Sequence, residues 1–214
     1  MEHSHNKIIE QVPLDYYQKG TKNNWFQKTW HSNKLRTVLS LIPNQPKTIL
    51  DVGCASGWFL SQVQKKFPKA QCYGIDIYEQ AIAYGKRLYP TIHFARANAQ
   101  KLPYSSEKFD IVISTEVLEH VDDPKHVLLE IKRVLKKGGY GVIELDSGSV
   151  LFSISWYLWR KFSGKVWNDS HLHSFNVKKL GHLMEDCGFR IIKKKTFNWD
   201  MAMAFLIQKR VENV

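Results

Sequence analysis

The stretch TILDVGCASGWFL, residues 48–60, decides the fold. It begins with an apolar run that ends at Asp51, passes Gly53, Ala55 and Gly57, and then becomes apolar again. A buried strand, a glycine-rich turn and the start of a helix give this pattern. Backbone N–H groups in such a turn can approach a small ligand closely. The sequence therefore predicts a strand, a ligand-binding loop and a helix over residues 48–67.

The same alternation of strands and helices continues along the chain. Further strands are expected at residues 71–76, 91–95, 109–114 and 140–145, and further helices at 78–89, 124–136 and 176–187, with final strands at 189–197 and 202–209. This spacing favours βαβ units around a parallel sheet, whose ligands bind beyond the carboxyl ends of the strands. We expect one α/β domain over residues 43–214, preceded by an N-terminal helical cap segment over residues 1–42.

Two classes of ligand use a loop of this kind, the dinucleotides and S-adenosylmethionine, and the spacing of small residues separates them. A dinucleotide site requires G-x-G-x-x-G, in which the third glycine lets the helix pack tightly beside the pyrophosphate. Those three positions are Gly53, Ala55 and Trp58, and the tryptophan argues against that packing. The alternative acid-x-Gly-x-small-x-Gly pattern is met from Asp51 to Gly57. A carboxylate at the strand end suits a ligand with ammonium and sulfonium charges.

The second predicted strand supplies a further test of the ligand. It ends in Asp76, where an acid can accept both hydroxyl groups of a ribose. With this acid, the chain resembles the class I S-adenosylmethionine-dependent methyltransferases of type 11, in particular the group similar to the ubiquinone and menaquinone biosynthesis enzymes. The blocks that carry the resemblance are collinear and read ILDVGCASGWF, YGIDIY, ANAQKLPYSSEKFDIVISTEVLEHVDDP and EIKRVLKKGGYGVIE.

The resemblance implies both a fold and a cofactor site. The fold is a Rossmann-like, doubly wound, mainly parallel seven-stranded sheet with an antiparallel last strand, with N-terminal helices and a substrate-cap insertion after strand five, at residues 147–175. The cofactor is S-adenosyl-L-methionine, with S-adenosyl-L-homocysteine as the product. The implied cofactor-binding residues are Asp51, Gly53, Cys54, Ala55, Gly57, Asp76, Ile77, Asn98, Ala99, Thr115 and Glu116. Ala55 stands where the family usually has glycine, and a methyl group is tolerated there unless the residue needs a positive φ.

Composition and charge limit the remaining choices. The chain has 214 residues, 43% hydrophobic and 24% charged, as in ordinary globular proteins. We expect no secretory signal and no transmembrane segment, because the longest apolar stretch, residues 150–159, is shorter than the roughly 20 residues that a bilayer crossing needs. The cysteines Cys54, Cys72 and Cys187 lie far apart. A reduced, cytoplasmic protein is therefore predicted, with no cysteine-based metal site.

Three histidines are candidates for a catalytic base, which methyl transfer needs only when the acceptor carries a proton. His120 follows Glu116 and Glu119 at spacings that give one face if the segment is helical. This face could ionise a substrate or hold a divalent cation, but a solvated helix start is the commoner arrangement, so no metal site is predicted. His171 and His173 share one side of an extended segment. The resemblance places this region on the substrate side, although a structural role accounts for one of the two equally well.

The acceptor is expected to contact the two segments outside the common core. NNWFQKTWH in the N-terminal segment and ISWYLWRKF in the insertion supply large aromatic side chains beside cations. Such elements could cover an apolar or ring-containing substrate, or could rest on a membrane to receive a lipid; packing of two small cap helices is the plainer alternative. Trp156, Trp159 and Trp167 are spaced too irregularly to define one helix face.

Three functions are therefore consistent with the sequence. The favoured one is methylation of an oxygen or carbon atom of a small-molecule or lipid acceptor, with peripheral membrane contact as an option. A nucleic-acid methyltransferase is suggested by the net charge of +11, but STEV at residues 114–117 lacks the N/D/S-P-P-aromatic motif of enzymes that methylate base amines. The third is a non-catalytic protein that binds S-adenosylmethionine and regulates a partner.

Overall fold

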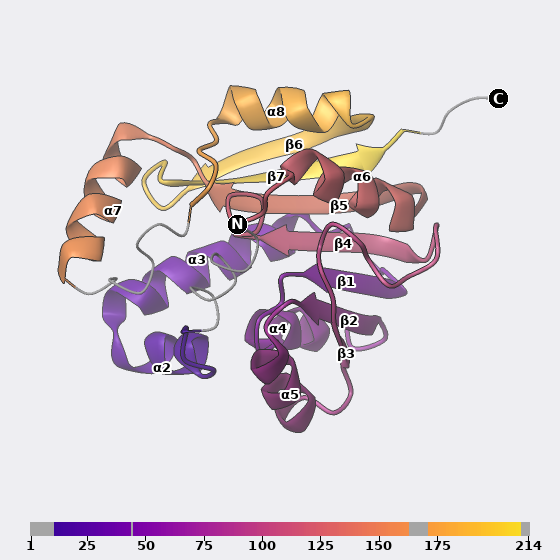
Figure 1. Ribbon diagram of the computed structural model, residues 1–214, viewed down its shortest axis with the longest axis horizontal. Coiled ribbons are helices and arrows are strands. Elements are labelled where there is room, and N and C mark those ends of the chain that lie inside the picture. Colours follow the sequence, from indigo (N-terminus) through magenta and orange to yellow (C-terminus); the bar gives the residue numbers. More distant parts are fainter. Residues whose placement is uncertain (1–10, 44, 163–170, 211–214) are drawn as a thin grey trace.

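The structure is a computed structural model that describes residues 11–43, 45–162 and 171–210. Within these residues, a mixed sheet of seven strands in the order β3-β2-β1-β4-β5-β7-β6 forms the centre of the molecule (Figure 1). The strands β1, β2, β3, β4 and β5 are parallel to one another, and β7 runs antiparallel to both of its neighbours. The Rossmann-like mixed sheet expected from the sequence is therefore confirmed.

The elements follow one another along the chain with the expected alternation. The N-terminal helices are α2 (Tyr16–Asn23) and α3 (Trp25–Leu41). The first half of the sheet comprises β1 (Thr48–Val52), α4 (Trp58–Lys66), β2 (Gln71–Asp76), α5 (Glu79–Leu88) and β3 (His93–Arg96). The second half comprises β4 (Phe109–Thr115), α6 (Pro124–Val134), β5 (Leu135–Asp146), α7 (Val150–Phe162), α8 (Val177–Asp186), β6 (Phe189–Phe197) and β7 (Ala202–Lys209).

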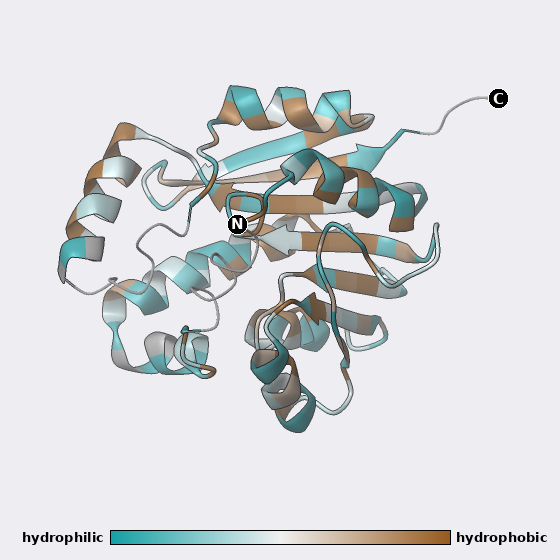
Figure 2. Cartoon of the chain, in the orientation of Figure 1, coloured by the Kyte–Doolittle hydropathy of each residue, from teal (hydrophilic) through white to brown (hydrophobic). Residues whose placement is uncertain are grey.

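Two apolar cores hold helices against opposite faces of the sheet. One core joins α6 and α8 to the sheet through buried side chains such as Leu128 and Leu180. The other joins α3, α4 and α5 to the sheet, with Val38, Leu60 and Ile82 among its buried members. The central strands are brown, and therefore hydrophobic, along most of their length in Figure 2. A strand that is covered on both faces reads as a continuous apolar run, which explains the sequences of β1 and β4.

The register of the strands gathers polar residues at one edge of the sheet. Val52 of β1 pairs with Ser114 of β4, and Thr115 pairs with Glu144 of β5. Asp76 is the last residue of β2, on the other side of β1. The parallel strands point toward this edge, where α2, the start of α3 and α7 lie (Figure 1). This is the side on which α/β sheets bind their ligands.

The observed elements differ from the predicted ones in several details. The N-terminal helical region is divided at Asn24, whose side chain accepts hydrogen bonds from the backbone N–H groups of Phe26 and Gln27 and so begins α3. The fifth strand begins at Leu135 rather than 140, because Leu135 already pairs with Phe109 before the register shifts. The part of the insertion that the structure describes contains a helix, α7. No helix among the described residues is long and apolar enough to cross a membrane.

Candidate active site

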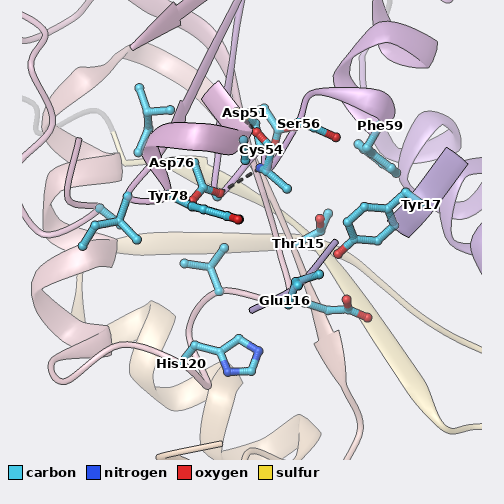
Figure 3. A pocket seen from close by; sticks show the side chains of 18 of the residues that line it. Tyr17, Asp51, Cys54, Ser56, Phe59, Asp76, Tyr78, Thr115, Glu116 and His120 are labelled. Atoms are coloured by element: carbon cyan, nitrogen blue, oxygen red, sulfur yellow. Dashed lines mark hydrogen bonds between the residues drawn. The ribbon is translucent and has the colours of Figure 1, made fainter. Parts of the chain in front are cut away.

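A first cavity of about 190 Å³ lies at the carboxyl ends of β1, β2 and β4 (Figure 3). Ten of the eleven residues expected to bind a cofactor line it: Asp51, Gly53, Cys54, Ala55, Asp76, Ile77, Asn98, Ala99, Thr115 and Glu116. These residues come from the ends of β1, β2 and β4, from the loops that follow them and from the loop after β3. The cavity is therefore the place where the motifs of the sequence meet.

The glycine-rich loop adopts the backbone conformation that its sequence predicts. Gly53 and Gly57 have φ values of 78° and 79°. The N–H groups of Gly53 and Cys54 both donate to the Ile75 carbonyl oxygen of β2, which fixes the loop on the neighbouring strand. A Cβ atom on Gly53 would lie 2.3 Å from Val117, so only glycine fits there.

Gly57 is the one predicted cofactor residue that does not line the first cavity. Its φ is positive, and a Cβ atom placed on it would lie 2.3 Å from the ring of Phe94. Its backbone N–H donates to the Cys54 carbonyl oxygen and closes the turn before α4. Gly57 therefore shapes the loop from behind, as a turn and packing residue.

Ala55 also has a left-handed backbone, with φ 46°. An alanine in this region is strained by roughly 1 to 2 kcal/mol relative to a residue in the right-handed region, and glycine is not. Its backbone N–H donates to the Asp76 side chain at 2.8 Å, drawn as a dashed line in Figure 3. Ala55, where the family usually has glycine, therefore has a backbone conformation that an alanine adopts only with strain.

Asp76 and Asp51 are two buried carboxyl groups in the wall of the first cavity. The Asp76 carboxylate accepts hydrogen bonds from the backbone N–H groups of Ala55 and Tyr78. Burial raises the pKa of Asp76, and these N–H groups oppose the rise. Asp51 is 1% exposed, and its Oδ1 atom has no hydrogen-bond partner among the described residues. Burial, followed by the charge of Asp76, raises the pKa of Asp51. A cationic ligand would supply the partner that Asp51 lacks.

Glu116 is held by a buried lysine that the sequence analysis did not single out. Lys34 of α3 places its Nζ atom 2.5 Å from Glu116 Oε1 and 3.6 Å from Glu144 Oε2. Although burial alone would raise the pKa of Glu116, Lys34 lowers it to about 2. Burial raises the pKa of Glu144 to about 8, with Lys34 opposing it. Lys34 therefore fixes the N-terminal helix onto the ligand edge of the sheet.

An aromatic contact reinforces this attachment. The rings of Tyr17 and Trp58 are stacked with centroids 6.4 Å apart, and His31 packs against both. Burial and then the charge of Lys34 lower the pKa of His31 to about 4. Trp58, which occupies the third position of the dinucleotide pattern, thus packs against the N-terminal helices instead of leaving room for a pyrophosphate.

A second cavity of about 280 Å³ adjoins the first, and Tyr17, His31, Glu116 and His120 line both. Its other described lining residues come from the N-terminal helices, from α7 and from the loops after the strands: Tyr16, Phe26, Gln27, Trp30, Glu119, Asp146, Phe152, Ser155, Trp156, Trp159, His171 and Met201. Of the sixteen residues that line the second cavity, six are Trp, Tyr or Phe that do not also line the first. The second cavity is therefore largely aromatic. The segments that the sequence marked as aromatic-rich therefore line it.

The three candidate histidines occupy different places. His120 lines both cavities, and His171 lines the second. The His171 ring lies between the rings of His120 and Trp156, at centroid distances of 4.9 Å and 4.8 Å. His173 lines neither cavity, and its Nε2 atom lies 3.3 Å from the Asp122 carbonyl oxygen. The first two histidines are thus placed to contact a ligand, whereas His173 contacts backbone.

The segment after β4 and the tryptophans of the insertion differ from the pattern considered in the sequence. The segment with Glu116, Glu119 and His120 is an irregular turn and not a helix, because Glu116 has φ 53° and the described chain becomes helical again only at Pro124. Trp156 and Trp159 both line the second cavity, and their rings lie 5.2 Å apart. Trp167 lies outside the described residues. Cys54, Cys72 and Cys187 are buried free thiols.

Sequence reasoning missed several residues at the two cavities. Tyr17 and Lys34 belong to a segment expected only to be helical, and Asp146 ends the fifth strand. Asp146 carried a usable signal, because an acid at the end of a parallel strand lies at the ligand edge, as Asp51 and Asp76 do. The position of Lys34 carried none, since a lysine in a helix is exposed by default.

Comparison with known proteins places the chain in a family. A family model described as a methyltransferase domain matches residues 25–194, most of the chain. The malonyl-[acyl-carrier protein] O-methyltransferase of Hahella chejuensis is 26% identical over 68% of this chain, which spans 51% of that protein. The demethylmenaquinone methyltransferase of Bacillus cytotoxicus is 26% identical over 84% of each chain. The chain thus spans about half the length of the first relative and most of the second.

The solved structures agree with the observed topology. A crystal structure of a protein from Thermotoga maritima described as a SAM-dependent methyltransferase has a TM-score of 0.75 at 20% sequence identity, and the match covers 96% of this chain and 100% of the other. At this identity the match shows the fold, and the family model supplies the membership. The chain therefore belongs to the methyltransferase-domain family, within the class I S-adenosylmethionine-dependent methyltransferases.

Proposed function

We propose that the protein transfers a methyl group from S-adenosylmethionine to an oxygen or carbon atom of an apolar small-molecule or lipid acceptor. The observation that carries the proposal is the shared wall of the two cavities, made by Tyr17, His31, Glu116 and His120. A donor in the first cavity and an acceptor in the second would meet at this wall. Holding two reactants in line in this way can lower a barrier by roughly 7 to 11 kcal/mol.

The first cavity fits the cofactor on several counts. The buried and unpartnered Oδ1 atom of Asp51 would accept from the ammonium group, and the Asp76 carboxylate would accept from the ribose hydroxyls. Ile77 and Ala99 offer apolar contact for the adenine ring. Asn98 would border the ring edge, although its Oδ1 atom already accepts from the Gln100 N–H in a turn. When bound, S-adenosylmethionine supplies an electrophilic methyl group on a sulfonium ion.

The side chains of the shared wall would orient the acceptor and exclude water. Tyr17 points into the site near Glu116 in Figure 3. Burial raises the pKa of Tyr17, so its hydroxyl stays neutral and can donate or accept a hydrogen bond. Glu116 is ionised and already paired with Lys34, which makes it a positioning group and a weak base. His120 and His171 are then the candidate bases for an acceptor hydroxyl.

The second cavity would bind the acceptor. Its aromatic lining suits a ring or an unsaturated chain. The relatives in the comparison are named for a quinone precursor and for malonyl-[acyl-carrier protein], so related chains include proteins with small-molecule and carrier-bound acceptors. In this proposal α2, α3 and α7 form the cap, and residues 1–42 act as the cap segment of the methyltransferase domain.

We also propose that the outer side of α7 rests on an anionic membrane surface. The inner side of α7, with Phe152, Trp156 and Trp159, lines the second cavity. The outer side is exposed and apolar, and comprises Val150, Leu151, Ile154, Tyr157 and Leu158. The helices α2, α3 and α7 contain Lys and Arg but no Asp or Glu. This charge complements acidic lipid headgroups, from which a lipid acceptor could enter.

The acceptor class can be tested with cofactor labelled in its methyl group. Incubation with a cell extract, followed by fractionation into lipids, small metabolites and nucleic acid, should place the label in the first two fractions. Trp156→Ala should abolish labelling and leave the affinity for S-adenosylhomocysteine within about twofold, because Trp156 lines only the second cavity. Label found only in the nucleic-acid fraction would overturn the acceptor class. Equal labelling by Trp156→Ala and the natural protein would overturn the assignment of the second cavity to the acceptor.

Membrane contact is tested separately by sedimentation with phosphatidylglycerol vesicles. The double variant Ile154→Ser/Leu158→Ser should bind at least tenfold more weakly than the natural protein. The matched control is Leu129→Ser on α6, since Leu129 is also an exposed apolar residue but lies on a helix that covers the sheet. Equal binding by the double variant and the control would contradict the membrane assignment.

A further inference from the structure

Glu119, His120 and His171 bring three potential metal-ligand atoms within 4.8 Å of one another at the second cavity. The backbone holds them in place. The Glu119 carbonyl oxygen accepts hydrogen bonds from the N–H groups of Leu172 and His173, at 2.8 Å and 3.2 Å. These bonds tie the loop after β4 to the segment before α8. Because of this tie, His171 is fixed beside the Glu119–His120 pair even though it is 51 residues further along the chain.

The Glu119 side chain is the observation that points to a ligand. Glu119 is 3% exposed, and neither of its carboxylate oxygens has a hydrogen-bond partner among the described residues. A buried polar group without a partner costs roughly 1 to 3 kcal/mol, and a charged one costs more. Two unsatisfied oxygens that face a cavity are therefore expected to meet something that the protein itself does not supply.

The side chains that line the second cavity indicate that the missing partner is a cation. Its described lining includes the carboxylates of Glu116, Glu119 and Asp146 and three histidines, but neither Lys nor Arg. Lys34 sits behind this wall and is paired with Glu116 and Glu144. Asp146 Oδ2 lies 3.9 Å from His171 Nε2. A carboxylate that is hydrogen-bonded to a ligand histidine usually orients it, and Asp146 is placed to do so after a small side-chain movement.

We infer that Glu119, His120 and His171 bind a divalent transition-metal ion, such as Zn²⁺, Mn²⁺, Fe²⁺ or Co²⁺, at the second cavity. Two imidazoles and one carboxylate suit these ions better than Mg²⁺, which prefers oxygen ligands alone. Ligand atoms at about 2.1 Å from one ion lie roughly 3 to 4 Å apart, so the site closes with small side-chain movements. Three protein ligands leave coordination positions open toward the cavity.

The open positions give the ion a role that rests on the proposed function. With the ion bound, His120 and His171 act as ligands and no longer as bases. An acceptor hydroxyl that coordinates the ion then loses its proton to bulk water, because the cation stabilises the oxyanion that remains. The O–H bond breaks, a metal–oxygen bond forms, and no electron is transferred. The acceptor oxygen is thereby held at the shared wall of the two cavities. The protein would then favour oxygen acceptors with an acidic or chelating hydroxyl group.

Cobalt is the probe for this site, because Co²⁺ bound by histidine and carboxylate absorbs visible light. Since His3 and His5 could bind Co²⁺ independently, the protein used carries His3→Ala and His5→Ala. Equilibrium dialysis of this protein should show one Co²⁺ per chain with a visible absorption band. Glu119→Gln and His171→Asn in the same background should each weaken binding at least tenfold. His182→Ala is the matched control, because His182 lies 3.9 Å from Glu185 in an exposed pair.

Co²⁺ binding and S-adenosylhomocysteine binding test the metal site and the proposed function separately. The metal site is overturned if the background protein does not bind Co²⁺ stoichiometrically. It is also overturned if Glu119→Gln and His171→Asn bind Co²⁺ as tightly as the background protein does. Should Glu119→Gln not fold, His171→Asn carries the same test. Calorimetry with S-adenosylhomocysteine on each variant reports the first cavity separately. Binding of S-adenosylhomocysteine without Co²⁺ binding overturns only the metal site, whereas Co²⁺ binding without it overturns only the proposed function.

Discussion

Lys34 of α3 and Glu116 at the end of β4 form a buried ion pair with 2.5 Å between Nζ and Oε1. The pair joins the N-terminal helices to the edge of the sheet where both cavities open. Lys34 is 3% exposed, and Glu144 provides it with a second carboxylate at 3.6 Å. Burial works against the charge of Lys34, yet the carboxylates of Glu116 and Glu144 raise its pKa. The cap is therefore attached by charge as well as by aromatic packing.

Removal of the lysine charge should destabilise the fold strongly. Lys34→Met keeps most of the side-chain volume but leaves Glu116 and Glu144 without their cation. Loss of one partner of a buried pair costs about 3 to 5 kcal/mol. The free energy of unfolding in urea should fall by this amount. The control is Lys136→Met, which breaks a half-exposed pair with Asp110 and should cost less than about 1 kcal/mol. Equal losses of unfolding free energy in the two variants would show that the buried Lys34 pair stabilises the fold no more than an exposed pair does.

Asp76 should control cofactor affinity. Asp76→Asn removes the charge that we assign to the ribose hydroxyls, while its amide oxygen can keep one backbone hydrogen bond. Because a charge-assisted hydrogen bond contributes about 1.5 to 3 kcal/mol, the Kd for S-adenosylhomocysteine should rise roughly 10- to 100-fold by calorimetry. Glu79→Gln, in an exposed ion pair with Arg96, should leave the Kd unchanged. A Kd that stays the same in Asp76→Asn would remove Asp76 from the binding site.

Ala55 should be the residue of the loop at which glycine is tolerated best. Ala55 has φ 46°, so Ala55→Gly relieves roughly 1 kcal/mol of backbone strain, which offsets the entropy that glycine adds to the unfolded chain. Ala99→Gly, at the same cavity, relieves no such strain, since Ala99 is not among the residues with positive φ. The free energy of unfolding of Ala55→Gly should exceed that of Ala99→Gly by about 1 kcal/mol. The reverse order would contradict the left-handed backbone at Ala55.

His31 should make stability depend on pH in acid. Its pKa is lowered from 6.5 to about 4, so between these values the unfolded chain binds a proton that the folded chain does not. Stability is therefore complete above pH 6.5 and is lost as the pH falls toward 4, by about 1.4 kcal/mol per pH unit in that window. Urea titrations should show this slope as a difference between the natural protein and His31→Gln. Parallel pH profiles for the two proteins would exclude the effect.

The parts of the fold that could be predicted from the sequence depend on local pattern. The strand ending at Asp51, the glycine turn and the acid at Asp76 are encoded within short stretches, and the structure brings these residues to one cavity. Gly57 shows the limit of this reasoning, because its spacing fits the motif, yet it does not line the first cavity and a Cβ atom on it would meet the ring of Phe94. A pattern of residue types does not show which side of a loop faces the ligand.

Other features of the site depend on residues that are distant in sequence. The burial of Lys34 is decided by carboxylates that follow it by more than eighty residues, so its own helix gives no sign of it. The turn at Glu116 has a left-handed residue, so Glu116 and Glu119 do not share the single helix face that their spacing would give in a helix. The contact of His171 with His120 results from hydrogen bonds to the Glu119 carbonyl oxygen. Tertiary contacts, and not local preferences, fix these three features.

The central claim is that the first cavity binds an adenosyl sulfonium cofactor through Asp51 and Asp76. The most direct test is isothermal calorimetry of the natural protein, titrated in turn with S-adenosylmethionine, S-adenosylhomocysteine, NADH and flavin mononucleotide. We predict binding of one equivalent of each adenosyl compound, at micromolar Kd or tighter, and no binding of the two nucleotides. Saturable binding of either nucleotide, with no heat from the adenosyl compounds, would contradict the account.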